Sequence, residues 1–232
     1  MPDGHDGVTP VPALIWSHGF RGSAAGVMRN GSIRRMVSEA GLALVAAQGV
    51  GGTWDLPYGP RTFDSDGAAE FAYYDDVIDD ITSTHLVDPD RIIASGFSAG
   101  GMVVWNLACS HPQQFAGFIP IAGTFWLKPP ETCKSPVSSI VHIHGDADRT
   151  VPLTGRAIGP TKQGEVPEAL AMYRAFGEFG GRQTSQAGGL SCETETSDSN
   201  DILAFCLFEG GHSFRTEYLA YGIKALRDAG QF

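Results

Sequence analysis

The sequence lacks a long apolar run and an excess of positive charge. No run of about 18 apolar residues is present, so no membrane-spanning helix is visible. The chain carries 16 Lys and Arg against 26 Asp and Glu, a formal net charge of −10. Such a surface repels phosphate backbones and anionic lipid headgroups. We therefore expect neither nucleic acid nor a membrane as partner, while the oligomeric state cannot be predicted from the sequence.

The sequence also lacks internal repeats, heptads and low-complexity linkers. A linker-free chain of 232 residues is predicted to form one domain over residues 1–232. The opening "MPDGHDGVTP" has neither the basic nor the apolar region of a signal peptide.

Cysteine is scarce, and no pair has the CxxC spacing, which disfavours a zinc ribbon or a thioredoxin-type site. The four cysteines form an even set, which in an exported protein allows two disulfides in three connectivities. We favour pairing within the two shorter loops, Cys109 with Cys133 and Cys192 with Cys206, because each bridge then closes one local loop. Four free thiols in a cytosolic protein are the alternative.

Apolar runs bounded by turn residues alternate with helical patterns along the chain. The alternation predicts an α/β fold: a mostly parallel sheet with helices on both faces. Four long irregular stretches lie between these segments, and we expect substrate contacts there. The acidic "SCETETSDSND" is predicted to be a solvated loop. The expected strands are 12–17, 42–47, 91–96, 117–122, 137–144 and 201–208; the helices are 70–85, 99–110, 166–179 and 213–229; the irregular stretches are 48–66, 123–136, 152–165 and 183–200.

A candidate nucleophile lies in "RIIASGFSAGGMVVWNLAC", which reads as strand, tight turn and helix. The G-x-S-x-G pattern in that context is typical of a nucleophile elbow, in which small residues two positions from the serine let strand and helix approach closely. The pattern therefore indicates Ser98 as nucleophile. In a chain with 30 glycines, the alternative is a purely structural Gly-rich turn.

A serine nucleophile needs a base and an orienting carboxylate. His212, in the Gly-rich "FEGGHSF", is the only histidine beyond the strand that ends at residue 144, so it is the predicted base. Asp146 and Asp148 in "HIHGDADRTVP" compete as the acid. Turn chemistry suits Asp146 as a residue that caps the loop, and we favour Asp148, partly because of the family resemblance described below.

Acyl transfer also needs N–H donors for the developing oxyanion. The N–H of Ala99, directly after the nucleophile, is one candidate. The second is expected from the loop "WSHGFRGS": the N–H of Phe20 first, that of Arg21 second. His18 is expected to be a structural hydrogen-bonding residue.

A metal site is the rival reading of the same region. His142, His144, Asp146 and Asp148 alternate, so a strict strand would point all four to one face. Position 147 is Ala, however, and no matching histidines follow, so too few ligands are available. We therefore predict no metal and no other cofactor.

Taken together, "WSHGF", "VDPDRIIASGFSAGGMVVWNLACSHPQQFAGFIPIAG", "CKSPVSSIVHIHGDADRTVP" and "GGHSF" resemble the esterase family of polyhydroxybutyrate depolymerase-like proteins and feruloyl or acetylxylan esterases. The resemblance spans residues 12–214. It implies an α/β-hydrolase fold, the triad Ser98, Asp148 and His212, and a Cys109–Cys133 bridge. No long apolar lid segment is apparent in the sequence, so we expect no large lid domain. The resemblance also implies export, hence a secreted or periplasmic protein whose signal peptide has been removed; a cytoplasmic protein is the alternative.

The chain departs from this family in two places that bear on substrate. Ser213-Phe214 replaces the Trp-Pro-Gly that usually follows the catalytic histidine, so one pocket wall differs. No added substrate-binding module is present, which argues against digestion of crystalline polymer.

Aromatic residues in the expected site loops suggest an apolar or sugar-stacking cleft. The activity expected is hydrolysis of short-chain, feruloyl or hydroxyalkanoate esters, with the net charge favouring neutral esters. A serine peptidase or acyltransferase using the same triad, and a non-catalytic binding protein, remain alternatives. The aromatic candidates are Trp54, Tyr58, Phe125, Trp126 and Phe214.

Overall fold

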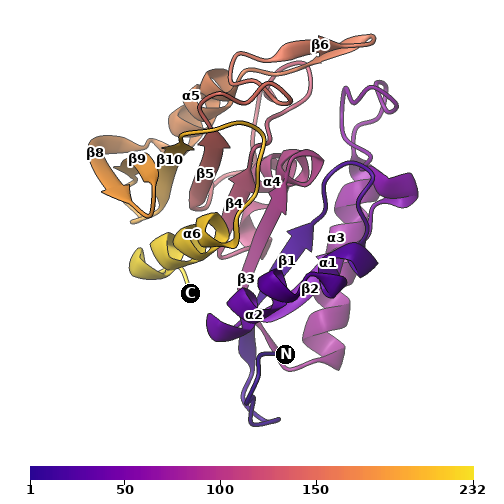
Figure 1. The fold of residues 1–232 in the computed structure, drawn as a ribbon, viewed down its shortest axis with the longest axis vertical. Coiled ribbons are helices and arrows are strands. Elements are labelled where there is room, and N and C mark those ends of the chain that lie inside the picture. Colours follow the sequence, from indigo (N-terminus) through magenta and orange to yellow (C-terminus); the bar gives the residue numbers. More distant parts are fainter.

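A computed structural model describes all 232 residues, and an eight-stranded sheet runs through its centre (Figure 1). Six neighbouring strands run parallel to one another. A hairpin extends one edge of the sheet, and its strand β9 is antiparallel to both flanking strands. The mostly parallel sheet predicted from the sequence is confirmed. In spatial order the strands are β2 (Ala43–Ala47), β1 (Val11–Ser17), β3 (Val87–Phe97), β4 (Gly117–Ile121), β5 (Ile140–Gly145), β10 (Ile202–Phe208), β9 (Leu190–Thr196) and β8 (Gly180–Ala187).

Helices cover both faces of the sheet, as predicted, because side chains alternate along each buried strand. Leu14 of β1 belongs to an apolar cluster with α1 (Ala24–Arg29), α2 (Gly31–Glu39) and α6 (Thr216–Asp228). The next residue, Ile15, belongs to the cluster on the other face, with α3 (Ala68–Thr84), α4 (Ala99–Ser110) and α5 (Val166–Gly177). Two short 3₁₀ turns, η1 (Val50–Gly52) and η2 (Pro112–Gln114), complete the elements. None of the helices combines the length and the apolar character that a membrane span requires.

Two of the stretches expected to be irregular contain hairpins. Residues 183–200 hold most of β8 and β9, so the prediction of a solvated loop for "SCETETSDSND" was wrong over its strand portion. Along β9, Leu190 and Cys192 are buried, and so is Glu195, whose carboxylate pairs with Arg174 and Arg182. Glu195 is an odd number of positions from both apolar residues and lies on the opposite face of the strand, so only Leu190 and Cys192 carry the two-residue apolar period that identifies a strand. The second hairpin, β6 (Arg156–Ile158) and β7 (Thr161–Gln163), lies within 152–165.

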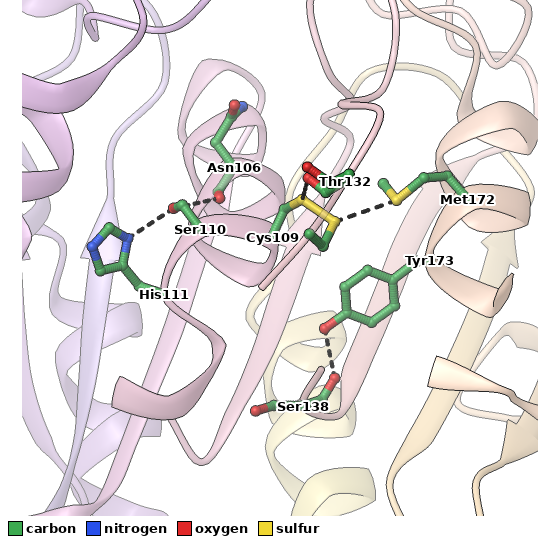
Figure 2. The surroundings of a disulfide bond; sticks show 9 residues. Asn106, Cys109, Ser110, His111, Thr132, Ser138, Met172 and Tyr173 are labelled. Carbon is green, nitrogen blue, oxygen red and sulfur yellow. Dashed lines mark hydrogen bonds between the residues drawn. A yellow bond between two sulfur atoms is a disulfide. The ribbon is translucent and has the colours of Figure 1, made fainter. Parts of the chain in front are cut away.

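Both short-loop disulfides are present. Cys192 and Cys206 face each other across β9 and β10, with Cα atoms 4.0 Å apart. Cys109, at the end of α4, is bonded to Cys133 in the loop before β5. Figure 2 shows the sulfur of Met172 beside this bridge, 3.4 Å from the Cys133 sulfur. The bridge therefore fastens a long irregular loop to the core where α4 and α5 approach each other.

Loss of the Cys109–Cys133 bridge should lower the free energy of unfolding by about 3 kcal/mol, because it closes a loop with a sequence separation of 24 residues. The double variant Cys109→Ala/Cys133→Ala, unfolded in urea and compared with the wild type, measures this. The variant Cys192→Ala/Cys206→Ala, whose loop has a separation of 14, is the matched comparison and should lose slightly less. A loss below about 1 kcal/mol for the first pair contradicts the loop-closure argument.

Candidate active site

Ser98 lies in the sharp turn between β3 and α4, with φ of 60° and ψ of −120°. This conformation is rare for residues other than glycine, so the surrounding structure must hold it in place. The glycines two residues away make the turn possible. A Cβ atom at Gly96 would lie 2.6 Å from the Gly100 carbonyl, and one at Gly100 would collide with the backbone oxygen of Ser17. The local geometry is that of the elbow predicted from the sequence.

Three loops that follow three parallel strands bring Ser98, His212 and Asp148 together. The His212 Nε2 atom lies 2.9 Å from Ser98 Oγ, and its Nδ1 atom lies 2.6 Å from Asp148 Oδ2. The His212 ring also packs against Phe97, with ring centroids 4.6 Å apart. The arrangement can move a proton from the serine hydroxyl to the imidazole.

The two competing aspartates have different environments. Asp148 is buried, and its Oδ1 accepts hydrogen bonds from the N–H groups of Thr150 and Val151 at 2.7 and 2.9 Å. Asp146 is exposed and accepts a hydrogen bond from the Gly210 N–H at 2.9 Å, so it caps the loop that carries His212. Only Asp148 contacts the imidazole.

Burial alone would raise the pKa of Asp148, but hydrogen bonds outweigh it. The side-chain bonds with His144 and His212, and the N–H groups of Val151 and Thr150, hold the pKa of this carboxyl well below its usual range. The carboxylate is therefore ionised wherever the imidazole can accept a proton, and can stabilise the resulting imidazolium.

The depressed pKa makes Asp148 a source of acid sensitivity. Its folded pKa lies below the unfolded value of about 3.9, so the stability it contributes is complete well above that pH and is lost as the pH falls. Urea unfolding at pH 6 and pH 3 should show a larger loss of stability for the wild type than for Asp148→Asn. Equal losses of stability in the two proteins would mean that folding does not lower the pKa of the Asp148 carboxyl.

The residues considered for a metal site form a hydrogen-bonded chain instead. The Trp105 indole N–H donates to His142 Nδ1 at 3.1 Å, and His142 Nε2 lies 3.0 Å from His144 Nδ1. The His144 Nε2 atom lies 2.8 Å from the Val151 carbonyl oxygen and 3.3 Å from Asp148 Oδ2. Burial, with a smaller effect from His144, lowers the pKa of His142 well below its usual value. No group of three or more His, Cys, Asp or Glu side chains is arranged to hold a metal ion.

Two backbone N–H groups beside Ser98 remain free for an oxyanion. Neither the Phe20 nor the Ala99 N–H donates a hydrogen bond within the chain, and both residues line the same cavity as Ser98. The Arg21 N–H, the second candidate, donates to the Gly52 carbonyl at 2.7 Å. This favours Phe20 over Arg21 as the second donor.

His18 fixes the loop that carries Phe20 through hydrogen bonds to the backbone and to neighbouring residues. Its ring is buried, with Nε2 accepting from the Gly49 N–H at 3.1 Å and Nδ1 lying 2.9 Å from the Gly19 oxygen. The Trp54 indole donates to the His18 carbonyl at 2.8 Å. These contacts match the structural role expected for His18.

A cavity of about 480 Å³ opens beside Ser98. Of the five aromatic candidates, Trp54 and Trp126 line it. The other three lie outside its lining. Phe125 is buried against Trp105, Phe214 packs on Trp16, and Tyr58 lies edge-on to Phe63. Two of the five candidate substrate contacts are thus at the cavity, and three serve local packing.

The β6–β7 hairpin supplies cavity residues that were not singled out in the sequence. Arg156, Ile158 and Gln163 come from it, and Arg61 and Thr62 come from the loop that carries Trp54. Both segments fall within stretches expected to contact substrate, so the location was predictable. The particular residues were not, because no motif marks them.

Comparison with known proteins gives both sequence and structural relatives. The family model Phospholipase/Carboxylesterase matches residues 63–159. A protein of Nocardia uniformis subsp. tsuyamanensis named "Putative esterase NocK" is 30% identical over 224 residues, which are 88% of this chain and 65% of that protein. Feruloyl esterase C of Emericella nidulans is 22% identical over 91% of this chain and 74% of its own.

Two solved structures have the same fold over nearly the whole chain. The Bacillus cereus carboxylesterase superposes with a TM-score of 0.64 and 12% identity, covering 97% of this chain and 90% of its own. The acetyl xylan esterase from Aspergillus awamori also gives 0.64, with 13% identity, covering 100% and 92%. At these identities the likeness concerns the fold.

Proposed function

Since this chain is an α/β-hydrolase related in sequence to esterases, we propose that it hydrolyses carboxylic esters through an acyl-enzyme formed on Ser98. The observation that carries the proposal is the continuous contact from Ser98 Oγ through the His212 ring to the Asp148 carboxylate. Residues 1–232 act as one catalytic domain in this proposal.

The reaction runs in two halves. His212 Nε2 takes the hydroxyl proton as Ser98 Oγ attacks the ester carbonyl, and the oxyanion is held by the Phe20 and Ala99 N–H groups. The C–O bond to the alcohol then breaks, and His212 returns the proton to the leaving oxygen. Water repeats the sequence on the acyl-enzyme, with His212 as base, and releases the acid and free Ser98.

The cavity supports small esters with an apolar or aromatic body. Its volume is within the range of sites for small molecules, and Trp54, Leu56, Met102 and Trp126 give it apolar surface. Feruloyl, hydroxyalkanoate and short-chain esters all fit this description. A serine peptidase or acyltransferase would use the same residues with a different acyl acceptor.

The two disulfides support export as part of this proposal, because such bonds persist in oxidising compartments. Secretion or a periplasmic location follows, with the cytoplasm as the alternative.

Covalent labelling tests the proposal directly. The intact mass of wild type, Ser98→Ala and His212→Ala is measured after exposure to a fluorophosphonate. One adduct on the wild type, mapped to Ser98 and missing from both variants, is expected. Folded wild type that takes no adduct would leave the turn at Ser98 as a structural element. Chromogenic esters assayed beside peptide substrates then separate esterase from peptidase.

A further inference from the structure

The charge of the cavity beside Ser98 is opposite to that of the whole molecule. Its nineteen lining residues include two arginines, Arg61 and Arg156, and no aspartate or glutamate. The chain as a whole has ten more acidic than basic residues, counted as 26 against 16. A cavity whose only charged lining side chains are positive, on a protein that is acidic as a whole, is suited to binding an anion.

Neither arginine is neutralised by a carboxylate. The eleven ion pairs of the chain, histidine contacts included, involve neither of them. Both residues are exposed and both line the cavity, so a ligand in the cavity can reach them. An unpaired guanidinium offers a planar set of N–H donors that matches a carboxylate.

Arg156 is fixed in place by its own hairpin, at the top of Figure 1. Its Nε donates to the side-chain oxygen of Gln163, its cross-strand partner, at 3.0 Å. Gln163 is buried, and its backbone pairs with Trp126 across an isolated bridge. Because Nε is already engaged, the remaining N–H groups of the guanidinium are left for a ligand.

Arg61 reaches the cavity from a different segment, the loop that also carries Trp54. Its guanidinium lies over the ring of Phe20, 5.8 Å from the ring centroid. Arg21 lies over the same ring at 5.2 Å. Stacking on Phe20 places positive charge next to the residue whose N–H is the proposed oxyanion donor.

We infer that Arg61 and Arg156 recognise a free carboxylate, and that the preferred substrates are esters carrying a second, unesterified carboxyl group. This rests on the proposed esterase function and names its substrate class. It departs from the expectation of neutral esters drawn from net charge, because the charges nearest the reacting bond weigh more than the sum over a screened surface.

Matched ester pairs that differ only in one carboxylate test the inference. One pair, 4-acetoxybenzoate and its methyl ester, places the charge on the alcohol side. The other, 4-nitrophenyl hydrogen adipate and 4-nitrophenyl methyl adipate, places it on the acyl side. For at least one pair, the ratio of kcat/KM for the anionic ester to that for the neutral ester should fall about tenfold in Arg61→Gln/Arg156→Gln, chiefly through KM. Raising NaCl to 0.5 M should lower the wild-type ratio as well.

Arg34→Gln/Arg35→Gln on α2 is the control, because it removes the same two charges from exposed positions outside this cavity. It should leave both ratios unchanged. Ratios in the double variant equal to those of the wild type would overturn the inference while leaving the esterase function intact.

Binding provides a readout that does not depend on turnover. By calorimetry, at least one of the two anionic esters, 4-acetoxybenzoate or 4-nitrophenyl hydrogen adipate, should bind Ser98→Ala at least tenfold more tightly than it binds Ser98→Ala/Arg61→Gln/Arg156→Gln. Equal binding of both esters to the two proteins overturns the carboxylate site. A tenfold difference with no hydrolysis by the folded wild type would keep the carboxylate site and reject the esterase function.

Discussion

Ser98→Ala should lower kcat for ester hydrolysis by about 10⁶-fold. In the proposed mechanism the hydroxyl oxygen forms the acyl-enzyme, and no other serine hydroxyl contacts His212. Alanine removes the nucleophile without adding volume, so the fold and the oxyanion donors should remain. Turnover of 4-nitrophenyl acetate by purified protein, with the circular dichroism spectrum as a check of folding, measures the loss.

Ser213→Ala is the matched control for this variant. Ser213 is next to His212 in the chain, but it is exposed and its hydroxyl makes no hydrogen bond within the protein. Its loss should change kcat less than threefold. If both variants lost activity to a similar extent, Ser98 would be a nearby serine rather than the nucleophile.

Asp148→Asn should lower kcat by about 10⁴-fold. The asparagine keeps the size of the side chain but can donate a hydrogen bond to His212 Nδ1. That contact favours the tautomer with the proton on Nε2, which cannot accept a proton from Ser98. The kcat of the variant at neutral pH, with the same ester, is the measurement.

Asp146→Asn separates the two aspartates of the same loop. This side chain accepts one hydrogen bond from the Gly210 N–H and does not contact the imidazole, so we expect a loss within about tenfold. A larger loss of kcat in Asp146→Asn than in Asp148→Asn would mean that Asp148 is not the triad acid.

The elements that could be predicted are those whose pattern is local. The turn at Ser98 depends on glycines at fixed positions relative to the serine, and the buried strands are continuous apolar runs. Both features can therefore be recognised from the sequence alone. Predicting the other two triad candidates required only the order of residues along the chain, because Asp148 and His212 each follow a strand in the parallel part of the sheet.

What could not be predicted depends on partners distant in sequence. Glu195 is charged yet buried, because Arg174 and Arg182 reach it from α5 and β8. Phe125 and Trp126 are adjacent and equally aromatic, but one packs on Trp105 while the other lines the cavity. An irregular loop has no regular alternation of side chains, so the sequence does not predict which of two adjacent residues faces inward.

The chain from Trp105 to Asp148 runs in one direction only. An indole can donate but not accept, so His142 must hold its proton on Nε2, and His144 in turn on its own Nε2. That last N–H is therefore aimed at the Val151 carbonyl and the Asp148 carboxylate. Every proton position behind the triad is thus set by one tryptophan buried in α4, and a proton taken up by Asp148 has no acceptor to pass to on that side. Asp148 Oδ2 is thus shared between the His144 N–H and the ring of His212, and of these two rings only that of His212 has its second nitrogen in contact with Ser98.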